Sequence, residues 1–195
     1  MKSVALLICG ALGKEVKTIV DEHGWDVDIY GVPAMHHFYP KKIVDAVERR
    51  LEQLSGRYRR VVVVYGDCGT AGALDPVLER HGAVRLRGPH CYEMFAGENF
   101  DQVAEEQPAT FFLTDWLVRN FERAVVRGLG LDRYPDLKPV YFGNYTNLLY
   151  LVQFPSDALA AKAREIAAYL ELPLEVRFVG FGELETRLAE LVEAA

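Results

Sequence analysis

Residues 59–72 read Arg-Arg-Val-Val-Val-Val-Tyr-Gly-Asp-Cys-Gly-Thr-Ala-Gly. A run of four valines that ends at a glycine is typical of a parallel strand whose two faces are both covered. The run therefore predicts a buried strand over Val61–Tyr65, which enters a glycine-rich turn that carries Cys68. A second strand is expected over Ala83–Leu86, and it ends in the Gly-Pro turn that presents His90 and Cys91.

Strand and helix patterns alternate along most of the chain, which indicates a parallel sheet with right-handed crossovers and helices on both faces. We therefore predict an α/β fold: a three-layer sandwich with a mainly parallel, doubly wound sheet of the Rossmann or flavodoxin-like kind. No linker or repeat interrupts the chain, so residues 1–195 are expected to form a single domain. The predicted strands cover residues 3–9, 26–32, 59–65, 83–86, 110–114, 140–143, 148–154 and 174–179.

Helices are predicted over residues 12–22, 41–54, 74–81, 115–129, 156–170 and 183–192, with a helical turn at 92–95 and a polar surface segment over 98–107. Thr114 or Asp115 is expected to be the N-cap of the fourth of these helices, and Ser156 the N-cap of the fifth, because short polar side chains satisfy the first free amides of a helix.

Composition excludes several classes of function. The 50% hydrophobic and 26% charged residues are the balance of an ordinary globular protein with a core. The net charge of −6 gives no support for a nucleic-acid partner. No apolar run reaches the ~18 residues that cross a bilayer, and the apolar stretch Val4–Cys9 is too short for a signal peptide. We expect a cytoplasmic protein with a small-molecule substrate and no membrane partner.

The chain has three cysteines, and each follows or ends a predicted strand: Cys9, Cys68 and Cys91. Their odd number and the absence of a Cys-x-x-Cys pair argue against a disulfide framework, a zinc knuckle or a thioredoxin motif. In the usual strand order 2-1-3-4 the three strands are neighbours, ~4.8 Å apart. Ligands bind at the carboxyl ends of such strands. The three thiols are therefore predicted to share a site, although a lone buried cysteine often serves only as a small hydrophobe.

Three chemistries fit such a site. Three thiolates and one imidazole make a tetrahedral zinc site, for which His36 in the loop after the second strand supplies the fourth ligand. Three thiolates alone can hold a [4Fe-4S] cluster with one open iron. Alternatively, one thiol is a nucleophile with His90 or His36 as its base. We favour zinc on Cys9, Cys68, Cys91 and His36, with the [4Fe-4S] cluster as the alternative.

The positions of further residues predict catalytic and cofactor-binding roles. His90 and Glu93 flank Cys91 and are predicted to be catalytic; Glu93 is placed to orient a ligand or to shuttle a proton. The segment from residue 66 to 72 is rich in glycine and lies between a strand and a helix, as a phosphate cradle would. A polar turn between later strands is a second candidate lining. The predicted cofactor-binding residues are Gly66, Asp67, Gly69, Thr70, Asn144 and Tyr145.

Several of these elements resemble an uncharacterised prokaryotic family, domain of unknown function 1638. The resemblance covers nearly the whole chain and is carried by Cys9-Gly10, the His36 loop, Tyr65-Gly66-Asp67-Cys68-Gly69, Gly88-Pro89-His90-Cys91-Tyr92-Glu93, Phe112-Leu113-Thr114-Asp115 and Asn144-Tyr145.

Members of the family occur in anaerobes and methanogens, often beside components of corrinoid-dependent methyltransferases. The resemblance therefore implies a link to one-carbon metabolism, with thiol or methyl-group chemistry and corrinoid or methyltransferase proteins as partners. The protein would then be either an enzyme of this metabolism or a non-catalytic accessory protein that holds a metal or cofactor. Where the family usually follows its loop histidine with asparagine, this chain has His37, which leaves the choice between His36 and His37 open.

Overall fold

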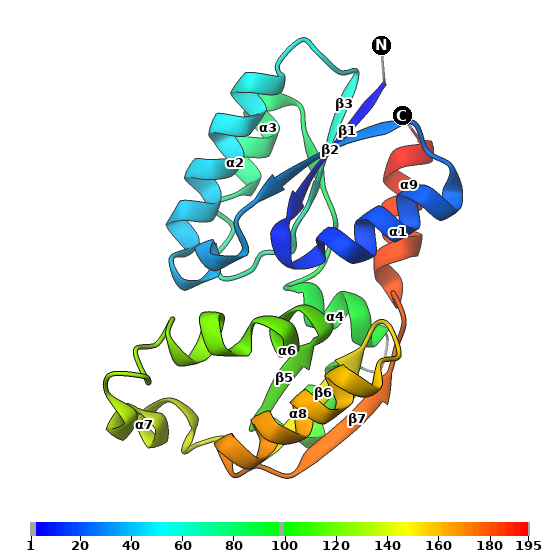
Figure 1. Ribbon diagram of the computed structural model, residues 1–195. Coiled ribbons are helices and arrows are strands. Elements are labelled where there is room, and N and C mark those ends of the chain that lie inside the picture. Colours follow the sequence, from blue (N-terminus) through cyan, green and yellow to red (C-terminus); the bar gives the residue numbers. More distant parts are fainter. Residues whose placement is uncertain (1–2, 98–99, 195) are drawn as a thin grey trace. The chain divides into compact units, whose positions relative to one another are not determined.

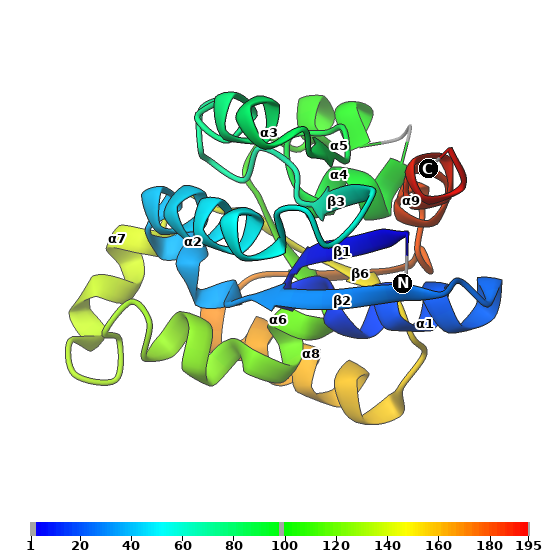
Figure 2. The same ribbon diagram turned by 90° about the horizontal axis from the view of Figure 1, so that it is seen from above.

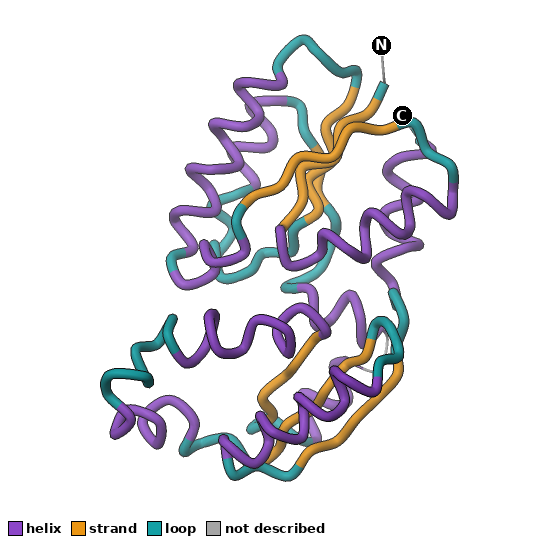
Figure 3. Tube along the Cα trace, in the orientation of Figure 1, coloured by secondary structure: helices purple, strands orange, loops and turns teal. Residues whose placement is uncertain are grey.

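A computed structural model describes residues 3–97 and 100–194 of the chain. The chain divides into two compact units, one made of Met1–Met94 with Glu183–Ala195 and the other of Phe95–Gly182. Each unit contains its own sheet (Figure 3). No helix of the described residues has both the length and the apolar content that crossing a membrane requires.

The first unit is built on a four-stranded sheet in the order β2-β1-β3-β4. All neighbouring strands are parallel, and β1 lies between β2 and β3 (Figure 2). This is the strand order predicted from the sequence. The strands are β1 (Val4–Cys9), β2 (Val27–Val32), β3 (Arg60–Val64) and β4 (Val84–Arg85).

Helices cover both faces of this sheet, so the first unit has three layers. Helices α1 (Gly13–His23) and α9 (Glu183–Glu193) lie on one face, and α2 (Pro40–Leu54) and α3 (Asp75–His81) lie on the other (Figure 1). Every side chain of β1 is buried, as expected for a strand with neighbours on all sides. The buried stripe of α2 has helical spacing and consists of Ile43, Val47, Leu51 and Leu54.

The second unit is built on a three-stranded parallel sheet in the order β5-β6-β7. Its strands are β5 (Thr110–Thr114), β6 (Asn147–Val152) and β7 (Leu174–Phe178). Helices α6 (Asp115–Phe121) and α8 (Asp157–Leu170) bury one apolar cluster with β5 and β6. Near the other face, α5 (Phe100–Glu106) places the Phe100 ring 5.5 Å from that of Phe112.

Short helical segments complete the two units. They are η1 (Gly10–Leu12), η2 (Ala34–Phe38), α4 (Cys91–Ala96), the π-helix η4 (Glu122–Val126), η5 (Pro135–Leu137) and α7 (Lys138–Phe142).

The predicted α/β class with mainly parallel strands is confirmed, but the expectation of one continuous sheet is wrong. Strand β4 has only two residues, so it offers little edge to a further strand, and β5 pairs with β6 instead. That residues 1–195 fold as one domain stays a prediction, because it concerns the cooperativity of unfolding.

Two local predictions differ from the structure. Residues 140–143 were expected to form a strand but lie largely in α7, where Pro139 occupies the first turn, a position that favours a helix. The predicted surface segment 98–107 forms α5 over its later residues, while residues 98 and 99 lie outside the described part of the chain.

The caps of α6 and α8 are as predicted. The Thr114 hydroxyl accepts a hydrogen bond from the Leu117 amide at 3.4 Å, and the Ser156 hydroxyl accepts one from the Leu159 amide at 3.3 Å. Of the two residues considered for the cap of α6, Thr114 is therefore the one whose side chain performs it.

Asp115 has a different task, because its side chain is fully buried. Its carboxylate accepts hydrogen bonds from the Tyr150 hydroxyl at 2.7 Å, the Gln153 amide at 3.2 Å and the Phe154 amide at 3.0 Å. The Asp115 amide donates in turn to the Gln153 side-chain oxygen at 2.7 Å. One buried carboxylate thus ties the start of α6 to the carboxyl end of β6.

This arrangement predicts unequal effects of two neighbouring substitutions. Asp115→Ala should lower the free energy of unfolding by about 3 kcal/mol or more, since it leaves several buried donors without an acceptor. Thr114→Ala, the control, should cost about 1 kcal/mol, the usual value of an N-cap. Urea unfolding measures both, and an equal or smaller loss for Asp115→Ala would contradict the role assigned to its carboxylate.

Candidate functional site

The three cysteines leave the carboxyl ends of three neighbouring strands of the first sheet. Cys9 is the last residue of β1, Cys68 lies in the turn after β3, and Cys91 begins α4 after β4. In the order β2-β1-β3-β4 these strands lie side by side. The structure therefore brings all three thiols to one edge of one sheet.

Cys9 is the most deeply buried of the three by exposed surface, at 4%. Its sulfur accepts a hydrogen bond from the Ala11 amide at 3.4 Å, so Cys9 is also the N-cap of η1. Burial raises the pKa of the Cys9 thiol, and the Ala11 hydrogen bond only partly offsets it.

The turn after β3 holds Cys68 in an unusual conformation. Its φ is 49°, in the left-handed region that residues other than glycine seldom adopt. The Asp67 carboxylate stabilises this turn by accepting hydrogen bonds from the Thr70 hydroxyl at 2.9 Å and from the amides of Ala71 and Gly72 at 3.1 and 2.8 Å. These bonds, that from Gly72 first, lower the pKa of Asp67. Cys68 is thus presented by a rigid turn.

The Cys68 turn is also fixed to the segment that precedes Cys91. The amides of Asp67–Cys68 donate to the carbonyls of Gly88–Pro89 at 3.1 and 2.7 Å. Gly66 makes this approach possible, because a Cβ at that position would lie 2.7 Å from the His90 nitrogen. The relative position of Cys68 and Cys91 is therefore set by the backbone.

An ion pair supports the Cys91 segment from the other side. Arg187 of α9 donates to both oxygens of the Glu93 carboxylate, at 2.6 and 2.8 Å, and to the Arg87 carbonyl at 2.9 Å. Both charged side chains are largely buried. This bidentate geometry makes Glu93 a residue that positions the Cys91 segment, whereas proton transfer by Glu93 stays a prediction.

His90 packs its ring against Tyr92, with centroids 5.5 Å apart. Its Nδ1 accepts a hydrogen bond from the Glu93 amide at 3.4 Å, within the first turn of α4. Burial lowers the pKa of His90, which favours the neutral imidazole. A role as catalytic base stays a prediction.

The thiols destabilise one another as thiolates. Burial first and the neighbouring Cys9 second raise the pKa of Cys68 to about 12. Burial, Cys9 and Cys68 raise the pKa of Cys91. At neutral pH the three groups are therefore neutral thiols, and they lie at the ends of neighbouring strands.

Two further residues of this site did not emerge from the sequence. Glu15 is 2% exposed, and its charge contributes to the raised pKa of Cys91. Its position supplied a signal, because Leu12, Glu15, Val16 and Ile19 share one inward helical stripe.

Tyr65, at the end of β3, is the second. It is 1% exposed, and its hydroxyl interacts with the Cys9 thiol closely enough for each group to shift the pKa of the other. Burial first and then Cys9 and Cys68 raise the pKa of Tyr65, so the phenol keeps its proton and can donate it in a hydrogen bond.

The histidines of η2 lie on the same side of the sheet as Tyr65. The ring of His37 stacks on that of Tyr65 with centroids 6.0 Å apart, and its Nδ1 hydrogen-bonds the Ala34 carbonyl at 2.8 Å. The Nδ1 atom of His36 is buried and has no hydrogen-bond partner among the described residues. Both imidazoles therefore remain candidates for a ligand.

The residues predicted to bind a cofactor are divided between the two units. In the glycine-rich turn, the amides of residues 67, 68 and 70–73 all donate to other groups of the protein, which leaves them occupied rather than open to phosphate. Asn144 and Tyr145 belong to the second unit and precede β6, and the Tyr145 ring packs 5.3 Å from that of Phe111. The cofactor-binding role of these residues stays a prediction.

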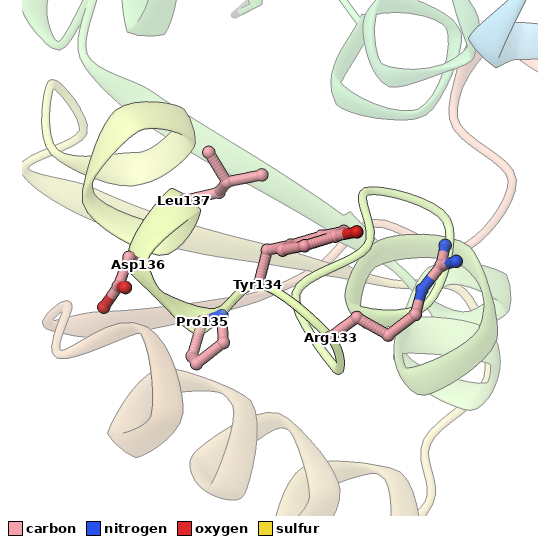
Figure 4. Close-up of a pocket in the computed structure, with 5 residues that line it drawn as sticks. All are labelled: Arg133, Tyr134, Pro135, Asp136 and Leu137. Carbon is pink, nitrogen blue, oxygen red and sulfur yellow. The ribbon is translucent and has the colours of Figure 1, made fainter.

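No preformed metal centre is present in the described residues: no three His, Cys, Asp or Glu side chains have the spacing that a bound ion requires. A pocket elsewhere is lined by Arg133, Tyr134, Pro135, Asp136 and Leu137, consecutive residues of one segment of the second unit (Figure 4). None of the residues predicted from the sequence lines this pocket.

Comparison with protein families gives one match. A family model described as "Protein of unknown function (DUF1638)" matches residues 32–188. The chain belongs to the DUF1638 family. The predicted family is thus confirmed, and the DUF1638 match includes His36, Cys68 and Cys91 but begins after Cys9. No curated protein matches the chain.

The contact at Gly66 predicts how sensitive the site is to one methyl group. Gly66→Ala should lower the free energy of unfolding by about 1–3 kcal/mol, because the new Cβ meets backbone atoms that cannot turn away. Gly31→Ala is a matched control, since its Cβ would meet nothing within 4 Å. Equal stability of the two variants in urea unfolding would contradict the close approach of the two segments.

The raised thiol pKa values predict slow alkylation of the folded, metal-free protein. At pH 7–8 few thiolates exist, so iodoacetamide should label all three cysteines more slowly than in urea, and the folded rates should still be rising at pH 10. Mass spectrometry of the labelled peptides gives each rate. A cysteine that reacts faster folded than unfolded at pH 7 would instead be an activated nucleophile.

Proposed function

We propose that the protein is a metal-dependent enzyme in which Cys9, Cys68 and Cys91 hold zinc, and that it acts on a small molecule through thiol or carbonyl chemistry. The observation that carries the proposal is the meeting of one buried and two partly buried thiols, which raise one another's pKa, at the carboxyl edge of the first sheet.

The donor set suits a thiolate-binding cation. Three closely placed thiolates are unfavourable in a buried setting, and a divalent cation reverses that cost by balancing their charge. Because the side chains do not yet have ligand spacing, metal binding would be coupled to rotation of the thiols, as in sites that form only with their metal.

A buried polar atom without a hydrogen-bond partner also supports the proposed metal. Buried donors and acceptors are nearly always hydrogen-bonded, and exceptions call for an explanation. His36 Nδ1 is buried without a partner among the described residues. We assign His36 as the fourth ligand. His37 is the competing choice, because a ring whose Nδ1 bonds a backbone carbonyl presents Nε2 in the manner of a ligand.

The roles of the other residues follow from their contacts. When bound, zinc would polarise a substrate carbonyl or stabilise a substrate thiolate at an exchangeable position. Asp67 holds the Cys68 turn, and the Glu93–Arg187 pair holds the Cys91 segment. The Tyr65 hydroxyl would donate a hydrogen bond to a sulfur or oxygen atom at the site, since its raised pKa keeps it protonated.

The reaction class rests on the family. The resemblance described above links such chains to corrinoid-dependent methyl transfer, so we propose a substrate or a protein partner from that chemistry. A [4Fe-4S] enzyme using the same cysteines and a non-catalytic accessory protein are the alternatives. The unpartnered His36 nitrogen supports zinc over the cluster, because a cluster held by three cysteines needs no imidazole.

Metal analysis of protein purified without oxygen tests the proposal. We expect about one zinc per chain, lost in each single Cys→Ser variant and weakened in a His36→Ala/His37→Ala double variant. His81→Ala, an exposed histidine of α3, is the control and should keep the metal.

Other outcomes separate the alternatives. A brown protein with about four irons per chain, kept in the double histidine variant, would replace zinc with a cluster. Zinc-loaded protein that co-purifies with methyltransferase subunits but has no turnover would be the accessory protein. Less than a tenth of an equivalent of either metal, with intact cysteines, would contradict the proposed site.

A further inference from the structure

The edge strand β7 exposes apolar side chains. Among the described strands, β7 pairs only with β6. Two large side chains on it are strongly exposed, Val176 at 53% and Phe178 at 65%. Natural edge strands are usually protected by charged side chains, lysine above all, by proline or by a bulge. The β7 sequence Leu-Glu-Val-Arg-Phe has no lysine or proline, and its ladder with β6 is regular over five residues.

On its outer side the backbone of β7 pairs with no other described strand. The Pro173 carbonyl accepts from the Leu148 amide at 2.9 Å, and the Val179 amide donates to the Val152 carbonyl at 3.0 Å. In a parallel ladder, successive residues point their backbone amide and carbonyl groups to alternate sides of the strand. The backbone groups of the odd-numbered residues of β7 therefore point toward β6. The amides and carbonyls of residues 174, 176 and 178 therefore point outward.

This edge is complementary to itself when a second copy runs antiparallel. With the two-fold axis at Val176, each residue whose backbone groups point outward lies opposite such a residue of the second copy. Pairs of this kind exchange two backbone hydrogen bonds. Leu174 then faces Phe178 of the second copy, which buries exposed apolar surface. On the opposite face, Glu175 lies across from Arg177 of the second copy, and the pair occurs twice by symmetry.

The charges also select the direction of pairing. A parallel, in-register arrangement would place Glu175 across from Glu175 and Arg177 across from Arg177, which is unfavourable. Within one chain Arg177 donates to Glu175 at 2.7 Å, and both side chains are exposed enough to exchange partners. The antiparallel arrangement about Val176 satisfies the charges, the apolar side chains and the backbone together, whereas the parallel in-register arrangement does not.

We propose that β7 is a self-association edge, through which two copies of this chain join their three-stranded sheets into one continuous sheet. The proposal does not depend on the metal site, because every residue that carries it lies in the second unit.

Sedimentation equilibrium of the full chain tests the dimer. The mass should rise from 22.0 kDa toward twice that value as concentration increases. Glu175→Arg or Arg177→Glu should raise the dimer Kd by about tenfold or more, since each places like charges across the axis. The Glu175→Arg/Arg177→Glu double variant restores complementarity and should recover the dimer. Glu165→Arg makes the same charge change at an exposed position of α8. It is the control and should leave the dimer Kd unchanged.

Val176→Lys supplies a second line of evidence, because an edge lysine opposes strand pairing without disturbing the bonds to β6. Circular dichroism should show that all variants remain folded. A wild type that stays monomeric at every concentration would overturn the proposal. A dimer Kd that Val176→Lys leaves unchanged would also overturn it. The same holds for a double variant whose dimer Kd is no lower than that of the single variants.

Discussion

The parallel pairing of β1 with both of its neighbours is the constraint on which the candidate site depends. Strand β1 is buried along its whole length and hydrogen-bonds β2 on one side and β3 on the other. Since all of these strands run in one direction, the segments that follow them emerge at a single edge. Cys9, Cys68 and Cys91, together with the histidines of η2, are brought to that edge by the direction of the chain alone.

Local interactions then convert this shared edge into a defined arrangement. The Asp67 carboxylate fixes the turn of Cys68, two backbone hydrogen bonds fix that turn to the segment before Cys91, and Arg187 secures Glu93. Arg187 belongs to α9, which returns to the first unit after the chain has completed the second. The last helix of the chain therefore supports a site whose thiols all lie in its first half.

The sequence predicted those parts of the structure that depend on short-range pattern. The valine run of β3 and the stripe of α2 indicate their elements directly, and the strand order follows from the usual crossover rules. The start of a new sheet at β5 was not predicted from the sequence. It depends on how few residues of β4 pair with β3, which the local pattern does not show. The local pattern around Asp115 indicated a helix cap. Its buried role depends on β6, which lies far along the chain and is not visible in that local pattern. Glu15 and Tyr65 were overlooked because their electrostatic effect on the thiols arises only from tertiary packing.

The central claim is that three thiols converge, a claim that is independent of the proposed metal. Trivalent arsenic tests it directly, because arsenite binds thiolates and completes its coordination with three of them. X-ray absorption of the reduced, metal-free protein with one equivalent of arsenite should show three sulfur neighbours around each arsenic, and Cys68→Ser should reduce that number to two. Arsenic that retains only oxygen neighbours, or a sulfur count unchanged by Cys68→Ser, would contradict the account.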